Sequence, residues 1–157
     1  MYFKNILVPY DESDHARSAI HIALGLAGPY PEARVSVVTV IPSAALPNPT
    51  LLGEGFEIPY AVGDPGGYER IMDSMVKRTV DDIQEVVNQS LDDAQCKVVA
   101  DAVISNSPVE GIANYVKSHD IDLVVMGRRG LGALRGMIGS VSFGVLRSVE
   151  VPVLTVK

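Results

Sequence analysis

The 157-residue chain lacks sequence features that disulfide-bonded, membrane-spanning and secreted proteins require. It contains one cysteine, Cys96, so no disulfide can form within the chain, and this thiol is expected to act as a small apolar side chain. No apolar stretch approaches the ~18 residues that a membrane-spanning helix needs. The first residues show no charged leader followed by an apolar signal core. These absences predict a cytoplasmic protein that is not inserted in a membrane.

Positive charge is also scarce. The sequence has 13 Lys and Arg against 19 Asp and Glu, a formal net charge of -6, which argues against general nucleic-acid binding because that affinity comes from basic surface facing phosphates. The histidines at 15, 21 and 119 do not group with Cys96 or with closely spaced acids, so no structural metal site is expected. Hydrophobic residues make up 47% and charged residues 20%, which indicates a single globular domain over residues 1–157.

Three common motifs are absent as well. A Walker loop requires a Gly-Lys pair, and the chain has none. The dinucleotide fingerprint Gly-x-Gly-x-x-Gly fails because Arg135 follows where the third glycine would stand. The esterase elbow Gly-x-Ser-x-Gly fails because Ser140 occupies the position of its first glycine. The chain is therefore not expected to belong to these three classes.

What the chain does have is a glycine-rich segment between an apolar run and a helix start. Residues 123–126 have the length and β-branched content of a strand buried on both faces. Within the next thirteen positions come five glycines and three arginines, and Gly139-Ser140-Val141 then opens a helix. Glycines permit close backbone approach and a helix N-terminus presents unpaired N–H groups, so residues 127–142 predict an anion-binding cradle. The alternative is an ordinary surface loop, but the order strand, loop and helix favours a phosphate site.

Hydrophobic periodicity predicts strands and helices in alternation. Strands are expected at residues 3–9, 34–41, 97–104, 123–126 and 151–156, and helices at residues 14–27, 69–92, 108–118 and 140–148. The apolar stripe of the first helix consists of Ala16, Ala19, Ile20, Ala23, Leu24 and Ala27. Alternating elements of this kind require crossover helices between parallel strands. The predicted fold class is therefore α/β, an open five-stranded parallel sheet with helices on both faces.

Two segments point to partners. Residues 43–68 show no periodicity, and a loop of this length is either functional or disordered. Its apolar middle favours a flap or a surface for an unknown protein partner. Pro152 cannot donate to a ladder, so the last strand is expected at a sheet edge. Apolar edges are seldom left bare, which predicts a symmetric homodimer through Val151–Val156.

Taken together, these residues resemble the universal stress protein family of the nucleotide-binding type. The resemblance covers nearly the whole chain, from residues 6–13 through residues 37–40 to residues 151–156. Its most specific part is the pattern Gly-x2-Gly-x9-Gly-Ser/Thr, which is present as Gly127, Gly130, Gly139 and Ser140. The resemblance implies a Rossmann-like fold of the adenine nucleotide alpha hydrolase-like kind. It also implies a stress-response regulator or nucleotide sensor that binds ATP, usually with a divalent cation such as Mg²⁺.

The resemblance further implies a role for each matching position. Pro9, Tyr10 and Asp11 would lie beside the adenine and ribose, with Asp11 near the sugar or a nucleotide-bound metal ion. The backbone of Val40 would meet the adenine. The positions that match the phosphate loop and the helix start are Met126, Gly127, Arg128, Arg129, Gly130, Gly132, Gly139, Ser140 and Val141.

One spacing departs from the family pattern. Eight residues separate Gly130 from Gly139, where the pattern has nine, and one missing residue can shorten a span by up to ~3.5 Å. ADP, AMP and no nucleotide at all are therefore alternatives to ATP, and a nucleotide-free homodimeric interaction module is the alternative function. Related nucleotidylyltransferases carry His-x-Gly-His where residues 13–16 read Ser-Asp-His-Ala, which argues against adenylyl transfer. The protein is not expected to be an enzyme. Weak ATP hydrolysis ranks last because no residue is an obvious base for water.

Overall fold

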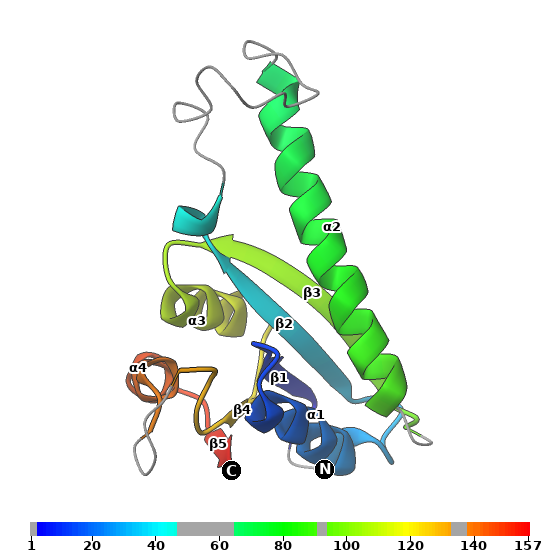
Figure 1. Ribbon diagram of the computed structural model, residues 1–157. Helices are drawn as coiled ribbons and strands as arrows, with labels where there is room; N and C mark the ends of the chain where they lie inside the picture. The colour runs from blue at the N-terminus through cyan, green and yellow to red at the C-terminus, as the bar shows by residue number, and fades with distance from the viewer. Residues whose placement is uncertain (1–2, 47–64, 91–93, 133–137) are drawn as a thin grey trace.

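A computed structural model describes residues 3–46, 65–90, 94–132 and 138–157. The elements in chain order are β1 (Asn5–Pro9), α1 (Asp14–Ala27), β2 (Arg34–Pro42), the 3-10 helix η1 (Ser43–Ala45), α2 (Pro65–Ser90), β3 (Lys97–Ser105), α3 (Pro108–Ser118), β4 (Leu123–Gly127), α4 (Ser140–Ser148) and β5 (Val153–Val156). The five strands form one parallel sheet in the order β3-β2-β1-β4-β5. Helices α1 and α2 cover one face and α3 and α4 the other (Figure 1). The predicted fold class is confirmed.

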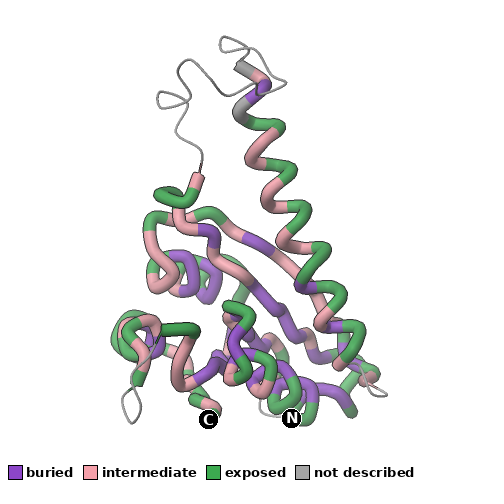
Figure 2. The backbone as a smooth tube through the Cα atoms, viewed as in Figure 1, coloured by how far each residue is buried: buried purple, intermediate pink, exposed green. Residues whose placement is uncertain are grey.

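The central strands are buried on both faces because their side chains alternate between two hydrophobic clusters. In β1, Ile6 and Val8 belong to the cluster shared with α1 and α2, whereas Leu7 belongs to the cluster shared with α3 and α4. In β2, Val35 and Val37 point to the first of these clusters. The backbone tube in Figure 2 is accordingly purple, meaning buried, along the middle of the sheet.

The helix signals read from the sequence are also found. All six residues of the predicted α1 stripe are buried. Ser13 caps α1, and its hydroxyl accepts a hydrogen bond from the N–H of Ala16 at 3.2 Å. Ser107 caps α3 in the same way by accepting from the N–H of Glu110 at 3.2 Å, and Pro108 occupies the first turn. These local signals therefore place the helix starts correctly.

Several predicted boundaries need correction. Helix α2 begins at Pro65, four residues before the predicted start, because proline fits the first turn of a helix, where its missing N–H is not needed. The predicted loop therefore contains η1 and the start of α2, while residues 47–64 lie outside the described ranges. Strand β5 begins at Val153 instead of 151, after Pro152, and occupies the edge next to β4 as predicted.

Two composition-based expectations can be compared with the structure. Cys96 is buried, and burial raises the pKa of its thiol, which agrees with an unreactive apolar role. Within the part of the chain that the structure describes, no helix is both long enough and apolar enough to cross a bilayer.

Candidate functional site

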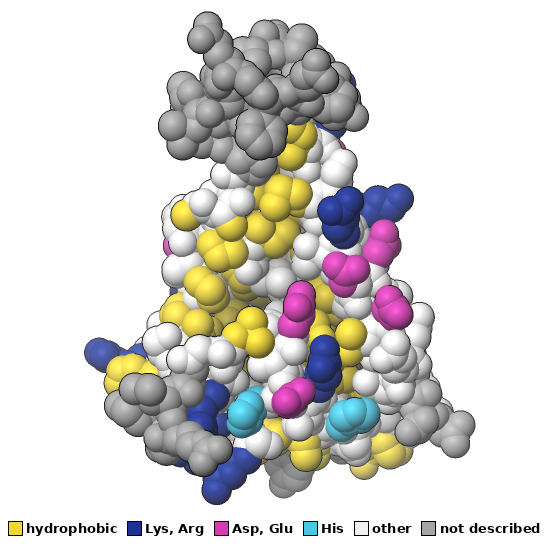
Figure 3. Space-filling model, viewed as in Figure 1, with side chains coloured by type: hydrophobic (Ala, Val, Ile, Leu, Met, Phe, Trp, Pro, Cys, Tyr) yellow, Lys and Arg dark blue, Asp and Glu magenta, His cyan; other side chains and the backbone are white. Residues whose placement is uncertain are grey.

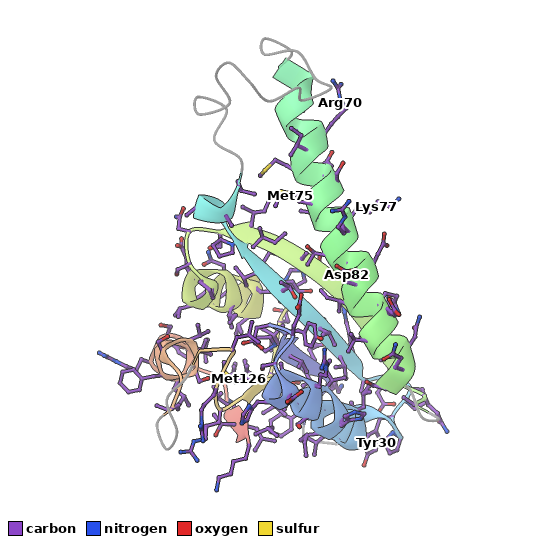
Figure 4. All side chains as sticks on the ribbon, in the orientation of Figure 1. Tyr30, Arg70, Met75, Lys77, Asp82 and Met126 are labelled. Carbon is purple, nitrogen blue, oxygen red and sulfur yellow. The ribbon has the colours of Figure 1, made fainter. Side chains whose placement is uncertain are left out.

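A cavity of about 610 Å³ lies at the carboxyl ends of β1, β2 and β4, within the size range of small-molecule sites. Open α/β sheets bind ligands at the carboxyl ends of their strands, at the point where the connections after two neighbouring strands leave the sheet in opposite directions. Met126, labelled in Figure 4, lies on β4 between α1 and α4. The predicted residues that line the cavity are Pro9, Tyr10, Asp11, Val40, Met126, Gly127, Arg129, Gly130, Gly132, Gly139, Ser140 and Val141. One cavity thus brings together residues from both ends of the chain.

The end of the cavity at β2 presents a free backbone edge. Strand β1 stops at Pro9, opposite Val38, and the N–H of Tyr10 donates to the Val38 carbonyl at 2.9 Å. Strand β2 continues to Pro42. Peptide groups in a parallel strand point alternately to its two neighbours, so the N–H and C=O of Val40 face the side that β1 has left. Among the described residues no backbone bond joins Val40 to that side, and the Tyr10 carbonyl accepts from the Thr39 hydroxyl at 2.9 Å.

Helix α3 closes the same end from the other face of the sheet. Gly111 lies so near β2 that an added Cβ would stand 2.7 Å from Cγ1 of Val40 and 3.1 Å from Cβ of Ser105. Pro108 and Ile112, also on α3, line the cavity. The sequence reading did not include these two residues, because nothing in the local pattern reveals which helix covers β2. This end of the cavity is apolar, with a peptide N–H and C=O at its edge.

The opposite end is formed by the start of α4. Its cap, Gly139, makes no side-chain cap hydrogen bond, so the first N–H groups of α4 are not satisfied by a cap. The hydroxyl of Ser142 donates to the Gly127 carbonyl at 2.9 Å and ties α4 to the end of β4. The Nε of Arg129 is buried and has no hydrogen-bond partner among the described residues. Donors and the positive end of the helix dipole therefore converge here, as an anion site requires.

Asp11 connects this loop to α1. One carboxylate oxygen, Oδ1, accepts from the N–H of Ser13 at 3.2 Å and from its hydroxyl at 2.6 Å. The other oxygen, Oδ2, faces Gly130 so closely that a Cβ at position 130 would collide with it. A side chain at 130 would therefore require the Asp11 carboxylate or the loop after β4 to shift.

Arg128 is the predicted site residue that does not line the cavity. Its N–H donates to the Val156 carbonyl at 2.6 Å, and its carbonyl accepts from the N–H of Gly139 at 3.0 Å. Its backbone thus holds the loop against β5. Residues that line the cavity but were not predicted include Thr39, Leu131 and Ser142, which directly follow or precede predicted positions.

A second cavity of about 530 Å³ shares Tyr10, Asp11, Thr39 and Leu131 with the first. Its other walls come from the segment before α1 and from α1 and α2, and they include the acidic residues Glu12, Asp82 and Glu85. Figure 3 shows Asp and Glu along α2, with Lys and Arg on the upper part of the same helix and further Lys and Arg at the lower left. Arg17 also lines this cavity, and its hydrogen bond to Tyr10 raises the pKa of the guanidinium. No group of three His, Cys, Asp or Glu within the described ranges is arranged to hold a metal ion.

The strand order, the glycine-rich loop and the strand-end cavity define a Rossmann-like α/β protein. The chain belongs to the universal stress protein family, whose sequence model matches residues 2–157. This agrees with the resemblance read from its glycine loop.

Individual relatives agree with this assignment. A Thermus aquaticus protein, the universal stress protein in the QAH/OAS sulfhydrylase 3' region, is 31% identical over 156 residues, which is 99% of each chain. The structure of universal stress protein UspA from Lactobacillus plantarum is similar with a TM-score of 0.69 at 25% identity, covering 100% of this chain and 99% of that one. A universal stress protein from Archaeoglobus fulgidus, solved in complex with dAMP, has a TM-score of 0.61 at 19% identity and covers 100% of both chains. At that identity the last likeness shows the fold alone.

Proposed function

We propose that this universal stress protein binds an adenine nucleotide in the 610 Å³ cavity and acts as a nucleotide sensor or stress-response regulator in the cytoplasm. The observation that carries the proposal is the pairing, in one cavity, of the free peptide edge at Val40 with the uncapped start of α4. A nucleotide has the complementary form, with a flat base at one end and an anion at the other. The dAMP bound by the Archaeoglobus fulgidus relative, which has the same fold, supports this class of ligand.

In the proposed complex the base lies against the apolar end, between Val40 and Ile112. The free N–H of Val40 donates to a ring nitrogen, and its C=O accepts from an exocyclic amine. These are the two groups that adenine offers side by side. The phosphates lie on the N–H groups of Ser140 and Val141, where the helix dipole favours negative charge. Arg129 supplies the positive side chain because its Nε is already buried at this end.

Among the described residues that line this cavity, Asp11 is the one carboxylate. Mg²⁺ is usually held by one or two carboxylates together with substrate phosphates and water. Asp11 would therefore contribute one oxygen to a nucleotide-bound Mg²⁺, and the phosphates would contribute the rest. ATP, ADP and AMP all fit the donor arrangement.

The proposal assigns no reaction to the protein. Hydrolysis of ATP needs a group that orients or deprotonates water near the terminal phosphate. The described residues that line the phosphate end are glycines, serines, apolar residues, Arg129 and Asp11, and the Asp11 carboxylate is bound by Ser13 and assigned to the metal ion, which leaves no base for water. A regulatory role is therefore favoured over an enzymatic one.

We also propose that the protein is a homodimer through β5. Leu154 on this edge strand is 41% exposed, and Phe143 and Leu146 on the neighbouring α4 are 51% and 43% exposed. Apolar side chains of this size on a bare strand edge favour association with a second copy. Because α4 also begins at the proposed phosphate site, bound nucleotide would act on the helix that carries this surface.

Isothermal titration calorimetry with ATP, ADP and AMP tests nucleotide binding, with Gly130→Ala compared against Gly25→Ala. A Cβ at 130 would collide with the Asp11 carboxylate, whereas a Cβ at 25, on α1 and outside the cavity lining, has no described atom within 4 Å. We expect Gly130→Ala to weaken binding by about tenfold or more, because either the loop or the Asp11 carboxylate must move out of its place in the site. Gly25→Ala should bind like the unaltered protein.

The far-ultraviolet circular dichroism of both variants serves as the control for folding. Loss of binding in Gly130→Ala with an unchanged spectrum supports the proposal. If none of the three nucleotides binds the unaltered protein at millimolar concentration, the nucleotide-free interaction module replaces it.

A further inference from the structure

Helices α3 and α4, which form opposite ends of the nucleotide cavity, also pack against each other. They lie side by side on the same face of the sheet (Figure 1). Ile112 of α3 lines the cavity at the end proposed for the base, and Ser140 and Val141 of α4 line it at the end proposed for the phosphates. Val109, also on α3, lies against Gly144 of α4. One pair of residues therefore joins the two helices that the nucleotide is proposed to bridge.

The two helices approach closely at this pair because residue 144 has no side chain. A Cβ on Gly144 would stand 2.6 Å from Cγ2 of Val109 and 3.2 Å from its Cγ1, whereas ordinary van der Waals contact begins at 3.4 Å. Glycine is less favourable than alanine in the interior of a helix. The nearness of Val109 gives a physical reason for a glycine in the middle of α4.

Of the two helices, α4 is the one that a larger residue at position 144 would displace. The buried residues of α3 are Gly111, Ile112, Tyr115 and Val116, whereas those of α4 are Ser142 and Val145. Ser142 donates to the Gly127 carbonyl at 2.9 Å, and Val145 packs in the hydrophobic cluster shared with α3. Both contacts run toward the sheet, so they resist a movement of α4 across it less than the larger buried face of α3 does. A Cβ at position 144 therefore pushes α4 away from α3.

A displaced α4 takes its first N–H groups with it. The helix has nine residues, Ser140–Ser148, and Gly144 lies about one turn after Ser140. A helix of this length moves as a unit, so a shift at Gly144 also moves the N–H groups of Ser140 and Val141. Binding groups must be held within about 0.5 Å of their productive positions. The 2.6 Å approach to Val109 falls short of the 3.4 Å of ordinary contact by more than this amount.

We propose that Val109 and Gly144 are positioning residues for the phosphate of the bound nucleotide, an inference that rests on the proposed function. Neither is among the described residues that line the cavity, so they act through α4. Their contact holds the start of α4 at the distance from α3 at which one ligand reaches both Val40 and Ser140. Because the contact controls the phosphate end, it affects the affinity for a nucleotide and not that for a nucleoside, which has no phosphate.

Nuclear magnetic resonance titrations of the ¹⁵N-labelled protein with AMP and with adenosine test this role. The amide signal of Val40 reports on the base, and the amide signals of Ser140 and Val141 report on the phosphate. We expect AMP to bind Gly144→Ala about tenfold more weakly than the unaltered protein, as when charge-assisted hydrogen bonds are lost. The AMP-induced shifts at Ser140 and Val141 should shrink in this variant. Adenosine should shift the Val40 signal of both proteins with the same affinity.

A second substitution should restore the phosphate contact. Val109→Ala removes both methyl carbons that meet the added Cβ, and it keeps the Cβ of residue 109, which would stand 3.5 Å away in ordinary contact. The double variant Gly144→Ala with Val109→Ala should therefore bind AMP nearly as tightly as the unaltered protein. Gly25→Ala is the matched control for a glycine-to-alanine change within a helix, because its added Cβ has no described atom within 4 Å. It should leave both affinities unchanged.

The outcomes separate this role from nucleotide binding itself. If neither ligand shifts any of the three signals in the unaltered protein, the proposed function fails and the positioning role fails with it. If AMP binds the unaltered protein and Gly144→Ala equally well, or if the double variant does not recover, nucleotide binding stands and the positioning role alone is wrong. Equal losses for AMP and adenosine, or a Gly144→Ala protein that circular dichroism shows to be unfolded, would mean that the contact supports the whole domain. Either result would also overturn the positioning role.

Discussion

Replacing Gly111 with alanine is expected to force α3 away from β2 at the apolar end of the nucleotide cavity. The added Cβ would stand 2.7 and 2.9 Å from the two methyl carbons of Val40 and 3.1 Å from Cβ of Ser105. The main chain of Val40 is held by its pairing with β3, and its β-branched side chain has few alternative rotamers, so its methyl groups have little freedom to move away. The strain should therefore be relieved by a shift of α3 along its whole contact with the sheet.

The expected change in the free energy of unfolding of Gly111→Ala is the sum of two opposing effects. Overpacking a tight contact costs about 1–3 kcal/mol, whereas alanine in place of glycine stabilises a helix by roughly 0.8–1 kcal/mol. The net loss of unfolding free energy is then about 0–2 kcal/mol. Gly25→Ala on α1 should show the gain in helix stability without the overpacking cost, because a Cβ there has no described atom within 4 Å. The difference between the two variants should thus be about 1–3 kcal/mol, the overpacking cost alone.

Urea unfolding followed by circular dichroism at 222 nm measures both variants, and the chain has no tryptophan to serve as an alternative probe. We expect the midpoint of Gly25→Ala to rise and that of Gly111→Ala to fall or stay level. Nucleotide affinity should fall in Gly111→Ala alone, since Val40 borders the proposed base site. Equal midpoints for the two variants would show that α3 moves freely and would refute the packing argument.

Two further predictions concern Tyr115 and the β5 edge. The pKa of Tyr115 is raised above its ordinary value of 10.0, mainly by burial, so its contribution to stability is present below pH 10 and is lost as pH rises through the folded-state pKa. Urea midpoints between pH 9 and 11 should therefore fall more steeply for the unaltered protein than for Tyr115→Phe. For the proposed dimer, Leu154→Glu should shift sedimentation equilibrium toward monomer, while Ile104→Glu, at the opposite sheet edge and 37% exposed, should not. A monomeric unaltered protein, or equal effects of the two charges, would contradict the β5 interface.

The parts of the fold that could be predicted from sequence are those fixed by local periodicity. The stripe of α1 is an example, because six small or aliphatic residues at helical spacing leave only one face to bury. The start of α2 was missed because Pro65, Gly66 and Gly67 read as loop residues. Proline is compatible both with a loop and with a first helical turn, and only the surrounding structure decides between the two.

Local sequence patterns also could not identify every residue of the candidate site. Arg128 and Arg129 are neighbours with identical side chains, so no local pattern distinguishes them. Their difference arises because the peptide of Arg128 is bonded to Val156 and Gly139, whereas Arg129 reaches the cavity wall. The contact between Val109 and Gly144 could not be foreseen either, since it depends on how α3 and α4 pack on the same face of the sheet.

The early end of β1 has a consequence for how freely position 40 can vary. The donor and acceptor that β2 exposes there belong to the main chain, so exchanging valine for another strand-forming residue leaves both in place. The side chain at position 40 is constrained instead by the close approach of Gly111 from α3. Substitutions that keep this helix contact would therefore preserve the polar edge, and the residue type at this position would be a poor guide to whether a family member retains it.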